Sequence, residues 1–571
     1  MPITLRFRNR HELLQGGLLG TYLFLSVTST VIGKAVRDAL FLSHFTALEM
    51  TYADLQTLVV IGISMGVYFR AHRSLSLRRL LISTSAVFAI GDVACWWAAT
   101  FHHASLTRLI YYWVGAQAAI TLPHASMLAG QILTTRQAKR VLGLIGTGAI
   151  FGWIAGGLVT TATAGRIGTE AILLVMAAMT AVSSPLILGV FRTFDTAPFD
   201  RRQVDPLASA PGLFRSASLV WGSRHLRAVA ALVFLSSVVT TIAGLQFKAI
   251  ASQSIGTTDR LTAFLGMFSF EAGLVSLAVQ ILCTSRILQY FGAGIGLVIA
   301  PLALATGSVG VLIWGTLSTA MFLKGSDHVL RHSIDRAALD MLYMPLSQSE
   351  TLQGKTFIEA VVYRMGDGVG AFAAAIGATV LHLSFSSLSI ISLAFLAGWI
   401  AAVIQARHGY VKSLLATLRQ HTETAGRKRA NDGVAAGSCP APVDGLFEPD
   451  HASRLATLRV LNGSRPCRPD GPATVEPLVT SLAAEIVGLY RLIHMSKAGH
   501  SYVAATPEYK ETVERIVRLL ELVAPENDPL SALAALESDD PRLKANGIEY
   551  LDNILKPEYR KFLVPLLEHK S

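Results

Sequence analysis

Three charged residues near the beginning of the chain have the spacing of one helix face. Lys34, Arg37 and Asp38 stand at i, i+3 and i+4 at the end of an apolar run. A charge in the core of a bilayer costs at least about 2.5 kcal/mol, so such residues usually face other helices or a polar cavity. We therefore expect this face to point into a helix bundle and to bind a charged ligand. The alternative is a cluster that extends to the lipid headgroups.

A second polar face lies in the segment FLKGSDHVLRHSIDRAALDMLY. Lys324, Asp327 and Arg331 follow one another at spacings of three and four residues, which places them on one side of a helix. This side is too polar for lipid, so we expect it to line a cavity; alternatively, the membrane span ends before Lys324. His328 and His332 stand at i and i+4, as two metal ligands on a helix would, but no third ligand is evident and we predict no metal site.

Further charged residues interrupt three other apolar runs. Arg364 and Asp367 stand at i and i+3 and form either a salt bridge that ties two helices together or a ligand contact. Glu271 lies near the middle of its run, where a carboxylate binds a proton or a counter-cation, or else pairs with Lys248 or Lys324. Lys248 itself ends the run before it.

Together these residues carry a surplus of positive charge. Guanidinium and ammonium groups replace the hydration that a phosphate ester loses on binding, so the surplus favours a small anionic substrate. No cofactor is expected. The predicted substrate-binding residues are Lys34, Arg37, Asp38, Lys248, Glu271, Lys324, Asp327, Arg331, Arg364 and Asp367.

The sequence contains no arrangement typical of an enzyme. It has no Walker-type loop, no HExxH and no GxSxG segment. The acids Asp327, Asp367 and Glu271 could act as bases on a lipid, but no nucleophile or metal set accompanies them. We therefore predict a protein that is not an enzyme.

The elements that must position these residues are long apolar helices. Hydrophobic residues make up 52% of the chain and charged residues 15%. Runs of roughly twenty apolar residues, each able to cross a hydrocarbon core about 30 Å thick as a helix, recur from Gly17 to about Gln405. We predict an all-α membrane protein of about twelve transmembrane helices, at 17–42, 55–69, 80–99, 109–133, 142–164, 169–191, 228–250, 261–283, 290–314, 316–342, 357–382 and 384–405.

The distribution of basic residues predicts how these helices cross the membrane. Arginine and lysine concentrate in alternate loops, whereas the other loops keep only Arg108, Arg166 and Arg260. This pattern places both termini in the cytoplasm of a bacterial inner-membrane protein that contacts lipids. The net charge of +11 lies entirely in residues 1–405, so it indicates topology and not nucleic-acid binding. The first run lacks a small-residue cleavage site and should remain as a helix.

A weak internal repeat divides the spans into two halves of six. GKAV around Lys34 aligns with FKAI around Lys248, an offset of 214 residues, and the alignment places Gln117 opposite Asp327. Parallel halves of this kind, with a substrate site between them, are typical of the major facilitator superfamily. The predicted parts are an N-terminal half at 1–191, a basic cytoplasmic linker at 192–227, a C-terminal half at 228–405, a flexible tether at 406–477 and a cytoplasmic helical domain at 478–571.

The predicted C-terminal domain suggests a second class of function. Its segment LSALAALESDDPRLKANGIEYLDNIL has helical periodicity and resembles a HEAT-type hairpin. A tethered cytoplasmic domain of this kind could bind a cytosolic protein. The alternative to a transporter is therefore a transporter-like membrane sensor or scaffold that acts through this domain.

Three motifs resemble a known family. They are GKAVRDALFLSHF, RQAKRVLGLIGTGAIFGWIAGGLV and DMLYMPLSQSETLQGKTFIEAVVYRMGDGVGA. They are similar to the ATP/ADP translocase-like branch of the major facilitator superfamily, and the C-terminal domain resembles the helical extensions of some bacterial relatives. The resemblance implies twelve helices, alternating access and nucleotide exchange. It matches Lys34 and Glu271 to functional residue types, whereas Arg364 stands where a lysine is expected, and the span at 109–133 offers Gln117 and His124 but no carboxylate.

Overall fold

The architecture is that of a computed structural model of the chain. It describes residues 10–132, 135–193, 213–344, 346, 348–431, 507–523, 529–536 and 541–555, with single positions 482, 485, 486, 563 and 567. The chain divides into two compact units, residues 1–341 with 349–404 and residues 342–348 with 405–571. All regular structure in the described ranges is helical, which confirms the predicted all-α class.

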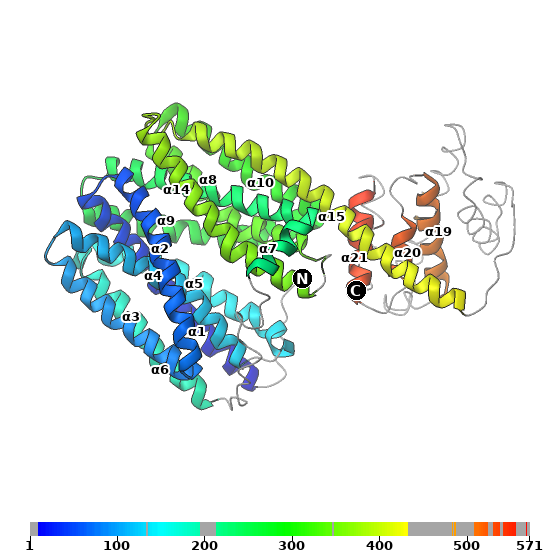
Figure 1. Cartoon of the computed structure of the whole chain (residues 1–571), viewed down its shortest axis with the longest axis horizontal. Helices are drawn as coiled ribbons and strands as arrows, with labels where there is room; N and C mark the ends of the chain where they lie inside the picture. The colour runs from blue at the N-terminus through cyan, green and yellow to red at the C-terminus, as the bar shows by residue number, and fades with distance from the viewer. Residues whose placement is uncertain are drawn as a thin grey trace. The chain divides into compact units, whose positions relative to one another are not determined.

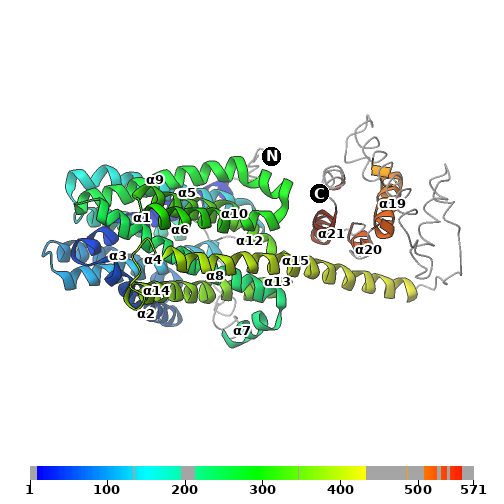
Figure 2. The ribbon, with the colours of Figure 1, turned by 90° about the horizontal axis from the view of Figure 1, so that it is seen from above.

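The first unit is a bundle of long helices that run alongside one another (Figures 1 and 2). Its helices are α1 (Arg10–His44), α2 (Ala47–Ser74), α3 (Leu77–Ala99), α4 (Ala104–Ile132), α5 (Thr135–Ile167), α6 (Ile172–Thr193), α7 (Leu213–Gly222), α8 (Arg224–Ser254), α9 (Thr258–Val279), α10 (Ser285–Trp314), α11 (Leu317–Leu330), α12 (Arg336–Leu342), α13 (Gln348–Phe357) and α14 (Tyr363–Thr379). Helix α15 (Ser389–Asn431) belongs to this unit as far as residue 404, and its remainder belongs to the second unit.

Nine helices of the described residues are long and apolar enough to cross a membrane. The predicted spans at 109–133, 316–342 and 357–382 are not among the nine, although their described residues are largely helical as well. The last two contain the charged candidate residues and are interrupted by π-helical turns at Arg331–Asp335 and Ile358–Val362. A multi-pass membrane protein is therefore well supported by helix length and composition.

Local signals explain where several helices begin and end. Thr46 and Glu49 form a reciprocal capping box at the start of α2, and Ser223 caps α8. Gly315 ends α10 with φ of 59°, a left-handed conformation that glycine adopts without a Cβ clash. Helix α7 and the start of α8 lie within the predicted linker at 192–227, and α15 continues to Asn431, beyond the predicted start of the tether at 406. Residues 432–477 lie outside the described ranges.

Glycine rows bring two pairs of helices into close backbone contact. A Cβ on Gly152 of α5 would lie 2.6 Å from the Phe24 carbonyl oxygen of α1. In the other half, a Cβ on Gly366 of α14 would lie 2.6 Å from the Phe234 carbonyl oxygen of α8. Gly152 and Gly366 are 214 residues apart, the same offset that relates Lys34 to Lys248. Small residues permit this approach in membrane bundles, and here both pairs use them in equivalent places.

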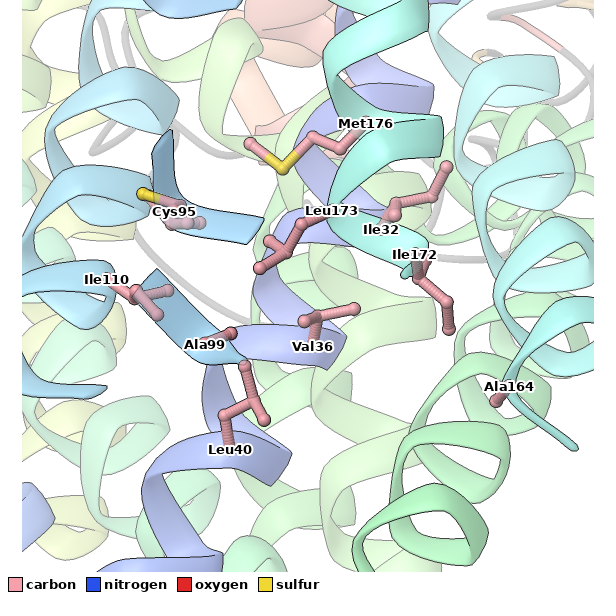
Figure 3. Packing of buried hydrophobic residues seen from close by; sticks show 11 residues of the cluster. Ile32, Val36, Leu40, Cys95, Ala99, Ile110, Ala164, Ile172, Leu173 and Met176 are labelled. Atoms are coloured by element: carbon pink, nitrogen blue, oxygen red, sulfur yellow. The ribbon is translucent and has the colours of Figure 1, made fainter. Parts of the chain in front are cut away.

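The N-terminal helices pack around an apolar cluster (Figure 3). Ile32 and Val36 of α1 meet Cys95 of α3, Ile110 of α4 and Met176 of α6 in this cluster. On α1, Ile32 and Val36 alternate with the charged residues Lys34 and Arg37, so tight packing of the apolar face fixes the direction in which those charges point.

In the second unit, the described helices of the C-terminal segment are α19 (Pro507–Val523), α20 (Leu530–Leu536) and α21 (Pro541–Ile554). Their apolar faces are buried, with Ile516, Leu520 and Leu551 almost fully enclosed. Arg515 pairs with Glu485 at 3.1 Å, and both side chains are buried. This part of the chain therefore has a core of its own.

Candidate functional site

Most of the predicted charged residues surround two adjoining cavities in the first unit. The larger, of about 410 Å³, lies among α1, α5, α8, α9 and α11, and the smaller, of about 310 Å³, reaches α2, α4 and α14. Lys34, Arg37, Lys248 and Lys324 line both. These cavities, taken together, are called the central cavity below.

Asp38 joins the two halves at one wall of the central cavity. Its carboxylate accepts a hydrogen bond from Arg37 Nε at 2.9 Å and lies 3.1 Å from Lys248 Nζ on α8. The Arg37 guanidinium also stacks over the Tyr111 ring, 4.4 Å from its centre. Lys34, Arg37 and Asp38 thus point into the bundle, as predicted, and do not extend to headgroups.

Asp327 holds a second group of charges on α11. Lys324 Nζ and Arg331 Nη2 each donate to its carboxylate at 2.8 Å, and Thr240 Oγ1 donates at 2.7 Å. Arg331 is the first residue of the π-helical turn Arg331–Asp335, and Tyr363 directly follows the π-helical turn Ile358–Val362. Arg331 Nη1 donates a hydrogen bond to Tyr363 Oη at 2.7 Å. Because a π-helical turn shifts the helix register by one residue, these turns bring Arg331 and Tyr363 together.

Arg364 and Asp367 line the smaller cavity on α14. Arg364 Nη1 lies 3.3 Å from Asp367 Oδ2, while Ser237 and Thr241 of α8 donate to Oδ1 at 2.5 and 3.2 Å. The pair is thus an ion pair within one helix that is hydrogen-bonded to the next. Arg364 remains half-exposed to the cavity and is available to a ligand as well.

Lys34 differs from the other cavity cations. Among the described residues no carboxylate lies within salt-bridge distance of its ammonium group. It is exposed to the central cavity, 5.9 Å from the centre of the Trp153 ring. An ammonium group that has no internal counter-charge is the natural contact for an incoming anion.

Aromatic rings form a second wall beside Lys34. Trp153 of α5 stacks on His328 of α11 with ring centres 4.6 Å apart, and His332 packs 4.6 Å behind His328. The indole Nε1–H of Trp153 is buried and has no hydrogen-bond partner among the described residues. The central cavity therefore has a cationic side and an aromatic side.

Glu271 is the predicted site residue that the structure does not bring to the cavity. It is exposed on α9 and is not among the lining residues. The predicted pairing with Lys248 or Lys324 is also not formed, because those lysines contact Asp38 and Asp327. Helical periodicity placed Glu271 on a span but did not show which side of that span faces the cavity.

Several polar contacts were missed by reasoning from the sequence. Thr240, Tyr363 and Trp153 gave no signal, because a single hydroxyl or ring in an apolar run is unremarkable. Asp92 did give a signal, a carboxylate in the predicted span at 80–99, and was overlooked. It lies in the N-terminal half, away from the lining residues of the central cavity.

The part of the chain that carries most of these cavity residues resembles known proteins. Residues 126–410 match the family model described as TLC ATP/ADP transporter. The matched segment includes Lys248, Lys324, Asp327 and Arg364, and it covers about half of the chain.

Curated relatives agree with this match. The chain is 23% identical over 259 residues to ADP,ATP carrier protein 1 of Chlamydia trachomatis. This aligned segment covers 40% of this chain and 48% of the relative. It is 23% identical over 212 residues to the plastidic ATP/ADP-transporter of Solanum tuberosum, covering 34% of this chain and 33% of the relative. The chain thus spans about half the length, or less, of these relatives.

Solved transporter structures show a general likeness. One is a bacterial homologue of the human lysosomal transporter Spinster in an inward-facing, unoccupied conformation. The match extends over 76% of this chain and 100% of the homologue, with 13% identity and a TM-score of 0.45. The other is the nucleoside transporter NupG. The match extends over 70% of this chain and 99% of NupG, with 12% identity and a TM-score of 0.49.

Proposed function

We propose that this protein is a secondary transporter of an organic anion, a nucleotide in the first instance, which works by alternating access of the central cavity. The observation that carries the proposal is the position of Lys34, a cavity ammonium group with no carboxylate partner among the described residues. Arg37, Lys248 and Lys324 surround it, and each is held in place by a carboxylate. An anion can therefore bind without the cavity rearranging first.

The aromatic wall supports a substrate that carries a flat ring. Trp153, His328 and His332 lie in the same cavity as the cations, so one molecule can reach both sides. A nucleotide combines a flat ring with phosphate groups, which agrees with the names of the family and of its relatives.

The finer organisation of the chain belongs to the same proposal. It comprises twelve transmembrane helices in two halves, 1–191 and 228–405, with the segment 192–227 between them. The C-terminal residues 478–571 form a soluble helical domain of HEAT-like type. Both termini lie in the cytoplasm of a bacterial inner membrane, because the basic residues concentrate in the loops on that side.

Uptake by proteoliposomes tests the proposal. Liposomes that contain the purified full-length protein should accumulate labelled nucleotide, and Lys34→Ala should weaken binding by about 1.5–3 kcal/mol, roughly 10- to 100-fold in Kd, because one charge-assisted contact is lost. Arg108→Ala is the matched control, since Arg108 is half-exposed and lies outside the central cavity. Uptake that is absent for nucleotides and for other phosphorylated anions would exclude this function.

A further inference from the structure

A buried aspartate in the N-terminal half has no cation near it. Asp92, in α3, is 0% exposed. Trp113 Nε1 donates to its Oδ1 at 3.1 Å, while Gln117 Nε2 and Thr180 Oγ1 each lie 3.1 Å from Oδ2. No ion pair joins Asp92 to any described residue. All its hydrogen-bond partners are therefore neutral.

Four helices meet at this carboxyl group. Asp92 comes from α3, Trp113 and Gln117 from α4, and Thr180 from α6, and Ser29 of α1 joins through Thr180 at 3.0 Å. Gly91 makes room for the indole, because a Cβ there would lie 1.9 Å from the Trp113 ring. These side chains, with the neighbouring thiol of Cys95, are referred to as the Asp92 network; Cys95 is its other titratable member.

The surroundings of the Asp92 network are apolar. Cys95 and Met176 belong to the cluster in Figure 3, and the Thr180 hydroxyl also lies 3.0 Å from the Met176 carbonyl oxygen. An ionised carboxylate without a counter-charge is strongly disfavoured in such a medium, and a buried acid takes up a proton instead.

The carboxamide of Gln117 offers an acceptor for that proton. Its Oε1 is buried and has no hydrogen-bond partner among the described residues, and the residue is 5% exposed. The oxygen and nitrogen of an amide exchange places by a half-turn of the group. In the present orientation, Gln117 Nε2 donates a hydrogen bond to the ionised Asp92 carboxylate. In the turned orientation, Gln117 Oε1 would instead accept a hydrogen bond from the protonated Oδ2 of Asp92.

We propose that Asp92 is a proton-binding site of the N-terminal half, that it takes up a proton in this conformation as the pH falls below neutral, and that its loading controls how α1 and α4 pack against α3 and α6. One proton binds at Oδ2 and leaves to water when the four helices separate; no other bond changes. The site lies behind the cavity wall, since Lys34 follows Ser29 by five residues and Gly115 precedes Gln117 by two. It does not depend on which anion is transported.

Infrared spectroscopy of the full-length protein in lipid nanodiscs tests the site directly. At mildly acidic pH we expect a carbonyl stretch of a protonated carboxylic acid, which disappears in Asp92→Asn and persists in Asp340→Asn, a half-exposed acid paired with Lys355. Identical spectra of the unsubstituted protein and Asp92→Asn would overturn the proposal.

Thermal melting gives a second, independent measurement. If folded Asp92 holds a proton that the unfolded chain releases, the folded state binds more protons and loses stability as pH rises. The melting temperature of the unsubstituted protein should therefore fall from acidic to neutral pH relative to that of Asp92→Asn. Parallel melting curves would contradict the proposal, and so would a stabilisation by sodium ions that Asp92→Asn lacks, because the ligand would then be a metal ion.

Discussion

Asp92 and Asp327 are both buried aspartates on helices of the membrane unit, yet their surroundings are opposite. Asp327 contacts the cations Lys324 and Arg331 beside the central cavity, whereas Asp92 contacts an indole, an amide and a hydroxyl inside the N-terminal half. At the repeat offset of 214 residues, Gln117, a partner of Asp92, corresponds to Arg331, a partner of Asp327, and not to Asp327 itself as predicted. Equivalent helices of the two halves thus present a charge to the cavity in one case and a neutral amide to the core in the other.

The difference shows that residue type alone does not decide the charge of a buried acid. A carboxylate between two cations is stabilised in its ionised form, whereas burial in an apolar medium without a cation favours the protonated form, an effect that neutral hydrogen-bond donors offset only in part. The C-terminal half therefore holds fixed charge at the site, and the N-terminal half holds a group that can change its charge.

The largest effect that would sharpen this comparison is expected from Asp327→Asn. Removing the carboxylate leaves Lys324 and Arg331 without their shared partner, which costs about 3–5 kcal/mol for a buried pair. Asp340→Asn, which removes half-exposed ion pairs with Arg336 and Lys355, should cost about 0–1 kcal/mol. The melting temperatures of both variants measure this contrast. Equal shifts would show that the ion pairs of Asp327 contribute no more to the stability of the protein than those of Asp340.

A smaller loss is expected from Gly91→Ala. The added methyl group would meet the Trp113 ring at 1.9 Å, so the indole must move away from Asp92 or α3 must shift away from α4. Overpacking of this kind costs typically about 1–3 kcal/mol. Gly62→Ala is the control, because nothing lies within 4 Å of a Cβ there. A melting temperature of Gly91→Ala equal to that of the control would mean that Trp113 is not held against α3.

The smallest effect is expected from Ser29→Ala. Ser29 contacts Thr180 and not Asp92 itself, so its loss removes one hydrogen bond at the edge of the Asp92 network, worth about 0.5–1.5 kcal/mol. The pH dependence of melting should remain as in the unsubstituted protein, because Asp92 keeps its three direct partners. Loss of that pH dependence would instead place Ser29 among the groups that determine whether Asp92 is charged.

Spacing along the chain predicted part of the site well. Lys34, Arg37 and Asp38 share one helix face, and so do Lys324, Asp327 and Arg331. Spacing sufficed here because the ion pairs within each group join residues that are close in the chain. Glu271 shows the limit of such reasoning. Its helix was predicted, but which neighbouring helix covers each of its faces depends on packing, and Glu271 lies on an exposed face.

The sequence by itself determined that this is a helical membrane protein, where its apolar helices lie, and which of them carry charge. Hydropathy and helical period act over a few turns, so neighbouring residues suffice to specify them. Only the tertiary structure decided that Lys248 meets Asp38, that Lys34 remains without a carboxylate among the described residues, and that Asp92 meets neutral partners from α4 and α6. These contacts join residues far apart in the chain, and it is the packing of whole helices that brings them together.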